Sequence, residues 1–177
     1  MATILAFAGS NSATSINFKL ATFTATQISE HDVEVVDMSK WTFPMYGEDD
    51  EKEHGFPEEA VNFMKKIAKA DAVILSVNEH NGYVSAYFKN LLDWLSRINR
   101  SFLEGKPVFL LATSPGKRGA IGSLEAMASV LPRFGGDVAA IFSLPSFYDN
   151  LKESNKIVDS ELSKSYKDAL KQFSDKI

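Results

Sequence analysis

Five short runs of apolar residues recur along the chain, and each of them predicts one strand of a sheet. They cover residues 2–8, 33–38, 72–77, 108–112 and 138–142. The runs at 2–8, 72–77 and 108–112 have almost no polar interruption, which is typical of parallel strands that are buried on both faces. The centre of a parallel sheet is therefore the expected place for these three runs.

Segments with apolar residues at helical spacing alternate with the predicted strands, at residues 16–28, 57–68, 85–98, 121–134 and 162–173. Pro57 suits the first turn of the second helix, and Gly135 suits the end of the fourth. Residues 41–47 are aromatic, prolyl and irregular. The acidic run 48–54 lacks the ligand spacing and central glycine of a calcium loop, so we expect a solvated loop there.

Strands that alternate with helices predict an α/β fold, an open parallel sheet with helices on both faces. We see no linker, repeat or low-complexity tract, and we expect one domain over residues 1–177. In such sheets ligands bind beyond the carboxyl ends of the strands. This rule selects the loops at residues 9–17, 77–84 and 113–119.

The predicted helix at 85–98 carries two apolar stripes, although one is enough to cover a sheet. Phe88, Leu92 and Leu95 form one stripe, and the second consists of Tyr87, Leu91, Trp94 and Ile98. The second stripe indicates either a subunit interface, in a homodimer or homotetramer, or cover by a neighbouring helix or loop of the same chain.

Composition excludes several classes of protein. The chain of 177 residues has no cysteine, which excludes disulfide scaffolds, zinc ribbons and thiol catalysis. The net charge of −4 makes broad binding to nucleic acid or anionic lipid unexpected. No apolar run approaches the length of a bilayer span, and no leader segment is recognisable, so we expect a soluble cytoplasmic protein. The three histidines are too scattered to suggest a hydrolytic triad with a serine, and we expect no metal site.

The first loop has the composition of an anion cradle. An apolar strand ends at Gly9, short polar side chains follow, and a helix pattern opens at once. The first N–H groups of a helix lack internal partners and lie at the positive end of its dipole. The alternative is an ordinary turn with a Ser or Thr cap. Neither the Walker lysine nor the three-glycine dinucleotide fingerprint is present, so a phosphate is expected but not a nucleoside triphosphate.

The other two loops complement this cradle. Residues 78–83 offer hydrogen-bonding groups, with His80 and Tyr83 as flat stacking surfaces. Residues 113–119 offer backbone N–H groups and Arg118, which suit a carbonyl or a second anion. A phosphate, a flat heterocycle and distant donors together describe a mononucleotide, without choosing adenine over flavin.

Three motifs in order carry a resemblance to a known family. They are Gly-Ser-Asn-Ser-x-x-Ser-x-Asn, Asn-Glu-His-Asn-Gly-Tyr-Val-Ser-x-Tyr-Phe-Lys-Asn-Leu-Leu-Asp-Trp, and Thr-Ser-Pro-Gly-Lys-Arg-Gly. The chain from about Ile4 to Pro145 resembles the NADPH-dependent FMN reductases, which include quinone, azo-dye and chromate reductases. Residues 41–49 are also similar to that family's Leu-Pro-x-Tyr-x-x-Asp segment.

The resemblance implies a flavodoxin-like three-layer sandwich with strand order 2-1-3-4-5. It implies FMN as cofactor, NADPH or NADH as co-substrate, ping-pong transfer to FMN, a quinone or a similar small acceptor, and no catalytic acid or base in the protein. The implied contacts are Ser10, Asn11, Ser15, Ile16 and Asn17 in the phosphate loop; Asn78, Glu79, His80, Asn81 and Gly82 facing the isoalloxazine ring; and Ser114, Pro115, Gly116, Arg118 and Gly119 at its pyrimidine end.

Three positions depart from the family pattern. Asn11 stands where the family often has Arg, and Asn78 and His80 replace Pro and Tyr. Loss of a guanidinium removes a charge-assisted phosphate contact, and His80 predicts a flavin affinity that depends on pH. A non-enzymatic flavodoxin-type carrier and a flavin-free binding module remain the alternatives.

Overall fold

The computed structural model describes residues 1–152 and 156–177 and contains the predicted parallel sheet. Its strands are β1 (Thr3–Ala8), β2 (Asp32–Val36), β3 (Ala72–Val77), β4 (Pro107–Thr113) and β5 (Asp137–Leu144). All neighbours are parallel, in the order β2-β1-β3-β4-β5. The predicted fold class and strand order are confirmed, with β1, β3 and β4 in the middle.

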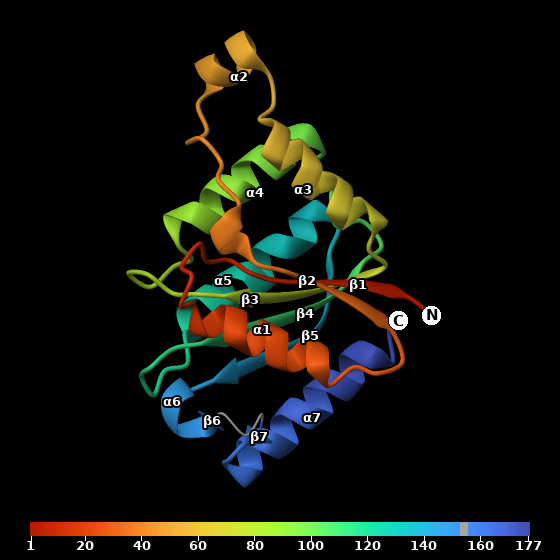
Figure 1. Ribbon diagram of the computed structural model, residues 1–177, viewed down its shortest axis with the longest axis vertical. Coiled ribbons are helices and arrows are strands. Elements are labelled where there is room, and N and C mark those ends of the chain that lie inside the picture. Colours follow the sequence, from red (N-terminus) through yellow and green to blue (C-terminus); the bar gives the residue numbers. More distant parts are fainter. Residues whose placement is uncertain (153–155) are drawn as a thin grey trace.

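Helices cover both faces of this sheet (Figure 1). One face carries α3 (Glu58–Lys69), α4 (Ala86–Ile98) and α5 (Ile121–Val130), and the other carries α1 (Ile16–Thr26) and α7 (Ser160–Ser174). Successive strand residues point to opposite faces. Leu5 and Phe7 therefore join the core below α3 to α5, while Ile4 and Ala6 join the core below α1 and α7.

Several short elements refine the predicted boundaries. A 3₁₀ turn, η1 (Met38–Lys40), follows β2, and another, η2 (Leu131–Phe134), continues α5 to the left-handed Gly135. The predictions missed α6 (Phe147–Asn150) and the two-residue strands β6 (Leu151–Lys152) and β7 (Lys156–Ile157). These elements are too short to give a periodic hydrophobic pattern.

The prediction of a loop at residues 48–54 is wrong, because this run forms α2 (Glu48–His54), which projects from the body of the molecule (Figure 1). Four acidic residues occupy its first turn, where the helix dipole favours negative charge. Glu48 also pairs with Lys52 one turn later, at 2.8 Å between Nζ and Oε1. No residue of α2 is buried.

The segment before α2 lies along α4, and we call residues 41–47 the strap. The indole Nε1 of Trp94 donates to the carbonyl of Pro44 at 2.8 Å, and the hydroxyl of Tyr87 lies 3.0 Å from the carbonyl of Trp41. Burial raises the pKa of Tyr87 far above its usual range, so this hydroxyl stays protonated. Trp94 is only 1% exposed. Of the two alternatives for the second stripe of α4, cover within the same chain is confirmed.

Among the residues that the structure describes, no helix is both long enough and apolar enough to cross a bilayer.

Candidate functional site

The three predicted loops meet at one edge of the sheet. β3 lies between β1 and β4, and the pairs Ala8 with Ser76 and Val77 with Ala112 align their carboxyl ends. The backbone N–H of Gly9 donates to the carbonyl of Ser76 at 2.9 Å. In Figure 1 the loops after β1, β3 and β4 all leave the sheet at the left of the view. The topology thus brings these loops together, as predicted.

The first loop leaves several backbone donors free at the start of α1. Ser15 is the N-cap, and its Oγ accepts from the N–H of Phe18 at 3.1 Å. No described group accepts from the N–H groups of Asn11, Ile16 or Asn17. The N–H groups of Ile16 and Asn17 lie in the first turn of α1, at the positive end of the helix dipole, so they can take an anion, and Asn11 adds a free donor in the loop that leads to this turn.

Asn17 is tied into the protein by its own side chain. Its Oδ1 accepts from the N–H of Thr113 at 3.0 Å and from the hydroxyl of Ser76 at 2.8 Å. Its Nδ2 donates to the carbonyl of Thr113 at 3.1 Å, and the residue is 3% exposed. The side chain therefore joins α1 to the ends of β3 and β4. Ser76 and Thr113 were missed as its partners, although each is a polar residue in or at the end of an apolar run.

Gly9 allows another group to come close to its backbone, and in the structure that group is a side chain of α4. A Cβ at this position would lie 2.8 Å from Cγ of Phe88 on α4. The hydroxyl of Ser85, the N-cap of α4, donates to the Gly9 carbonyl at 2.8 Å. The glycine therefore allows the backbone of the first loop to pack directly against α4.

The second loop turns tightly at the predicted Asn81-Gly82 pair. Both central residues have positive φ, 54° and 78°, which is typical of a type I′ turn. His80 and Tyr83 exchange two backbone hydrogen bonds across it, at 2.7 and 3.2 Å between N and O. The N–H groups of Asn81 and Gly82 have no described acceptor, and both residues are exposed. The turn thus presents two adjacent donors at the edge of the sheet.

Asn78 and His80 form a pair at the base of this turn. The Nδ2 of Asn78 lies 3.3 Å from Nε2 of His80. The Oδ1 of Asn78 is buried and has no partner among the described residues. A buried polar atom without a partner is uncommon in a folded protein. It adds an unfilled hydrogen-bonding position to this edge.

The third loop is fixed at its ends and open in the middle. The N–H groups of Ser146 and Phe147 donate to the carbonyls of Gly116 and Ser114, at 3.0 and 3.1 Å. At Gly119, with φ 59°, a Cβ would meet the Oγ of Ser143 at 2.2 Å. Between these anchors, the N–H groups at residues 116–118 have no described acceptor. Pro115 and Arg118 are exposed.

The second and third loops are also joined to each other, which the sequence pattern did not predict. The Oε2 of Glu79 accepts from the backbone N–H of Ser123 in the first turn of α5, at 3.1 Å. A Cβ on Gly122 would lie 2.9 Å from this same oxygen. The available signal was a glycine at the start of a helix pattern, which often marks a close approach of another segment.

The chemistry of this edge fits a mononucleotide with a flat ring. Free backbone donors gather at the α1 terminus, at the Asn81-Gly82 turn and in residues 116–118, and an orphaned acceptor lies at Asn78. Donors suit phosphate and ring carbonyl oxygens, and an acceptor suits a ring N–H or a hydroxyl. Among the described residues no cluster of three His, Asp or Glu side chains can hold a metal ion.

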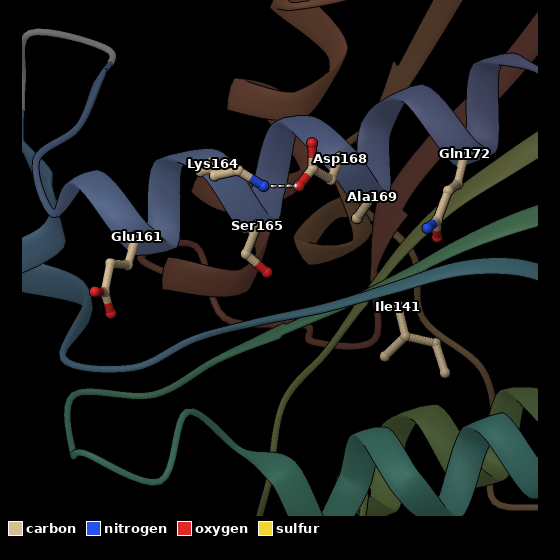
Figure 2. A pocket seen from close by; sticks show the side chains of 7 residues that line it. All are labelled: Ile141, Glu161, Lys164, Ser165, Asp168, Ala169 and Gln172. Carbon is tan, nitrogen blue, oxygen red and sulfur yellow. Dashed lines mark hydrogen bonds and ion pairs between the residues drawn. The ribbon is translucent and has the colours of Figure 1, made fainter.

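A separate groove of about 400 Å³ lies between α7 and the edge strand β5 (Figure 2). Ile141 lines it from β5, with its side chain directed away from α7, and Lys164 and Asp168 pair along α7 at 2.7 Å. None of the residues predicted to bind the cofactor lines this groove.

Comparison with known sequences confirms the resemblance. Residues 2–148 match the family described as NADPH-dependent FMN reductase. Quinone reductase of Escherichia coli (strain K12) is 34% identical over 105 residues, which make up 54% of this chain and 56% of that protein. The NADPH azoreductase of Bacillus sp. (strain OY1-2) is 36% identical over 100 residues, 55% of this chain and 52% of that protein. The chain therefore matches about half the length of these relatives.

Comparison with solved structures supports the flavodoxin-like fold. The flavoenzyme NAD(P)H:(acceptor) oxidoreductase FerB from Paracoccus denitrificans superposes with a TM-score of 0.78 and 22% identity, covering 99% of this chain and 96% of FerB. An FMN-dependent NADH-azoreductase from Bacillus anthracis, solved in complex with FMN, gives a TM-score of 0.62 at 12% identity and covers 99% of both chains.

Proposed function

Because the chain belongs to the NADPH-dependent FMN reductase family, we propose that it binds FMN at the carboxyl edge of its sheet. We further propose that it uses NADPH or NADH to reduce FMN, a quinone, an azo compound or a similar small acceptor. The observation that carries this proposal is the set of unpaired backbone donors from three loops that the topology joins at one edge.

The phosphate belongs at the start of α1 in this proposal. The free N–H groups of Asn11, Ile16 and Asn17 would donate to it, together with the hydroxyls of Ser10 and Ser15. These hydroxyls belong to residues only 7% and 8% exposed, so they are held in place by the fold. Neutral donors at a helix terminus can hold a phosphate without a guanidinium. Asn17 contributes its backbone, because its side chain is already engaged.

The isoalloxazine ring belongs against the second and third loops. The N–H groups of Asn81 and Gly82, and those at residues 116–118, would donate to its carbonyl oxygens. The Oδ1 of Asn78 would take a donor of the ligand. The pyrimidine end of the ring would be bordered by the third loop, at Ser114, Pro115, Arg118 and Gly119. The Asn81-Gly82 turn would be held in place by its neighbours Glu79 and His80.

The redox chemistry, acceptance of a hydride from the nicotinamide and delivery of electrons to a second substrate, belongs to the cofactor. The protein's task is to orient the ring and to leave one face open. His80, Tyr83 and Arg118 are exposed around this edge, so a nicotinamide and then an acceptor could occupy the same place in turn. This arrangement corresponds to a ping-pong order of substrates.

A homodimer or homotetramer through helix 85–98 also remains a proposal. The strap covers the second stripe of α4, so such an interface would use the outer surface of the strap. Met45, in the strap, is 71% exposed, and Phe56, between α2 and α3, is 42% exposed. Mass measurement in solution, before and after Met45→Ser and Phe56→Ser, tests this assembly.

The central experiment is a fluorescence titration of FMN with the purified protein, followed by oxidation of NADH and NADPH in the presence of a quinone. We expect saturable quenching at one FMN per chain and turnover with at least one nicotinamide. Binding without NAD(P)H oxidation would instead support a flavodoxin-type carrier. A chain that binds no FMN would support the flavin-free module and overturn the proposal.

A further inference from the structure

Glu79 lies in the second loop, yet its carboxylate is directed to the start of α5. Its Oε2 accepts from the N–H of Ser123 at 3.1 Å. Glu79 is partly exposed and belongs to none of the ion pairs found in the described part of the chain. Its only described side-chain partner is therefore a helix terminus.

The start of α5 has no cap of its own. The N-cap position is Ala120, whose side chain cannot accept a hydrogen bond and whose backbone is left-handed, with φ 61°. This backbone conformation is strained for a residue other than glycine, and it persists only when the surroundings hold it. Glu79 supplies from another loop the acceptor that the helix lacks, which is a reason for this conformation to persist.

The contact also fixes how close the two loops come. A Cβ on Gly122 would lie 2.9 Å from Oε2 of Glu79 and 3.1 Å from the carbonyl oxygen of Gly82. Both distances are too short for an ordinary side-chain contact, so only glycine allows this spacing without a shift. The Asn81-Gly82 turn is thus seated on the first turn of α5.

We propose that Glu79 is a positioning residue, which clamps the turn at residues 80–83 to the start of α5 and sets the spacing of the loops around the flavin ring. The proposal rests on the proposed function. It also assigns the carboxylate an electrostatic effect. A negative charge at this helix terminus offsets the positive end of the dipole and disfavours the more negative, reduced form of a nearby flavin. Glu79 therefore lowers the two-electron midpoint potential of bound FMN.

The test separates position from charge with two substitutions at one residue. Glu79→Gln keeps an oxygen that can accept from Ser123 but removes the charge, whereas Glu79→Ala removes both. We expect Glu79→Gln to bind FMN within about twofold of the wild type and to raise its midpoint potential. We expect Glu79→Ala to weaken FMN binding by about tenfold, the equivalent of one lost hydrogen bond. Glu53→Gln, on the exposed α2, changes net charge equally and should alter neither quantity.

Gly122→Ala provides a variant that leaves Glu79 intact. Its Cβ should push the turn away from α5, weaken FMN binding and leave the charge in place. Hydrogen exchange of the Ser123 amide in the flavin-free protein gives a readout independent of the cofactor. We expect faster exchange in Glu79→Ala, and exchange close to the wild type in Glu79→Gln. Cooperative urea unfolding of each variant shows that it is folded.

Two results overturn the inference while leaving the proposed function intact. One is a folded Glu79→Ala variant whose FMN affinity and Ser123 amide exchange rate equal those of the wild type, which would show that Glu79 does not clamp the turn. The other is an unchanged midpoint potential of bound FMN in Glu79→Gln, which would show that the Glu79 charge does not influence the flavin. Failure of the wild-type protein to bind FMN would overturn the proposed function itself.

Discussion

The strap on α4 and the carboxyl edge of the sheet are both built from side chains that bond to the backbone of distant segments. In the strap, side chains of α4 form hydrogen bonds with the strap's own backbone groups. Asn90 donates to the carbonyl of Pro44 at 2.9 Å and accepts from the N–H of Tyr46 at 2.7 Å. Trp94 donates to the same carbonyl. The carbonyl and N–H groups of the strap are therefore used to hold it on the helix.

At the carboxyl edge the side chains instead fix the loops and leave their backbone donors free. Asn17 holds β3 and β4, and Ser85 holds Gly9, but the N–H groups of Asn81 and Gly82 stay without a described acceptor. The difference shows which polar side chains hold the fold together and which backbone groups stay unpaired. A polar side chain near a site is not by itself a ligand contact.

Trp94→Ala should have the largest effect on stability. It removes a fully buried ring and its bond to the strap, and truncation of a buried Trp costs about 3–5 kcal/mol of unfolding free energy. Urea denaturation measures this loss. If the strap is structural, the folded fraction should bind FMN as the wild type does. Loss of FMN binding in a variant that remains folded would show that the strap also contributes to the site, which would contradict this division between the two regions.

Asn17→Ala should come next. It leaves the buried N–H of Thr113 without its acceptor, and an unsatisfied buried donor costs about 1–3 kcal/mol. Chemical denaturation should show this loss in the absence of flavin. The opposite pattern, wild-type stability together with strongly reduced FMN affinity, would assign the side chain to the phosphate, as the resemblance implied.

Ser15→Ala should have a smaller effect on stability and a separate effect on binding. Loss of an N-cap costs about 1 kcal/mol. Asp159→Ala, at the N-cap of α7, gives a matched loss of stability away from the proposed site. FMN titration should show weaker binding in Ser15→Ala alone. Equal FMN affinity in the two variants would show that the Ser15 hydroxyl does not reach the phosphate.

Arg97→Met should have the smallest effect, because it removes an ion pair at the surface next to the strap, in which the Arg97 side chain is half exposed. Hydrogen bonds from Arg97 are the main cause that lowers the pKa of Glu51 below its ordinary value of 4.5. The pair therefore stabilises the folded state above about pH 4.5, and the contribution is lost as pH falls through the lowered pKa. Urea midpoints of wild type and variant should differ slightly at neutral pH and converge in acid. A difference that grows in acid would contradict the assignment.

The sequence predicted the strands closely because a buried parallel strand leaves little room for polar residues. The run at 72–77 coincides with β3, and the Asn81-Gly82 turn has the expected left-handed backbone. The prediction for the acidic run at 48–54 was wrong, because its charges favour a helix that needs no apolar face. The second stripe of α4 allowed two alternatives, since a stripe on a helix does not say which surface covers it.

For the candidate site, the sequence by itself determined which loops lie together, because strand order and chain direction place these three loops at one sheet edge. It did not determine what each side chain does there. Asn17 and Glu79 were predicted as cofactor contacts, but the tertiary structure gives both side chains partners inside the protein. Hydrogen bonds between residues 96 and 44 positions apart depend on how strands and helices pack, and no local pattern encodes them.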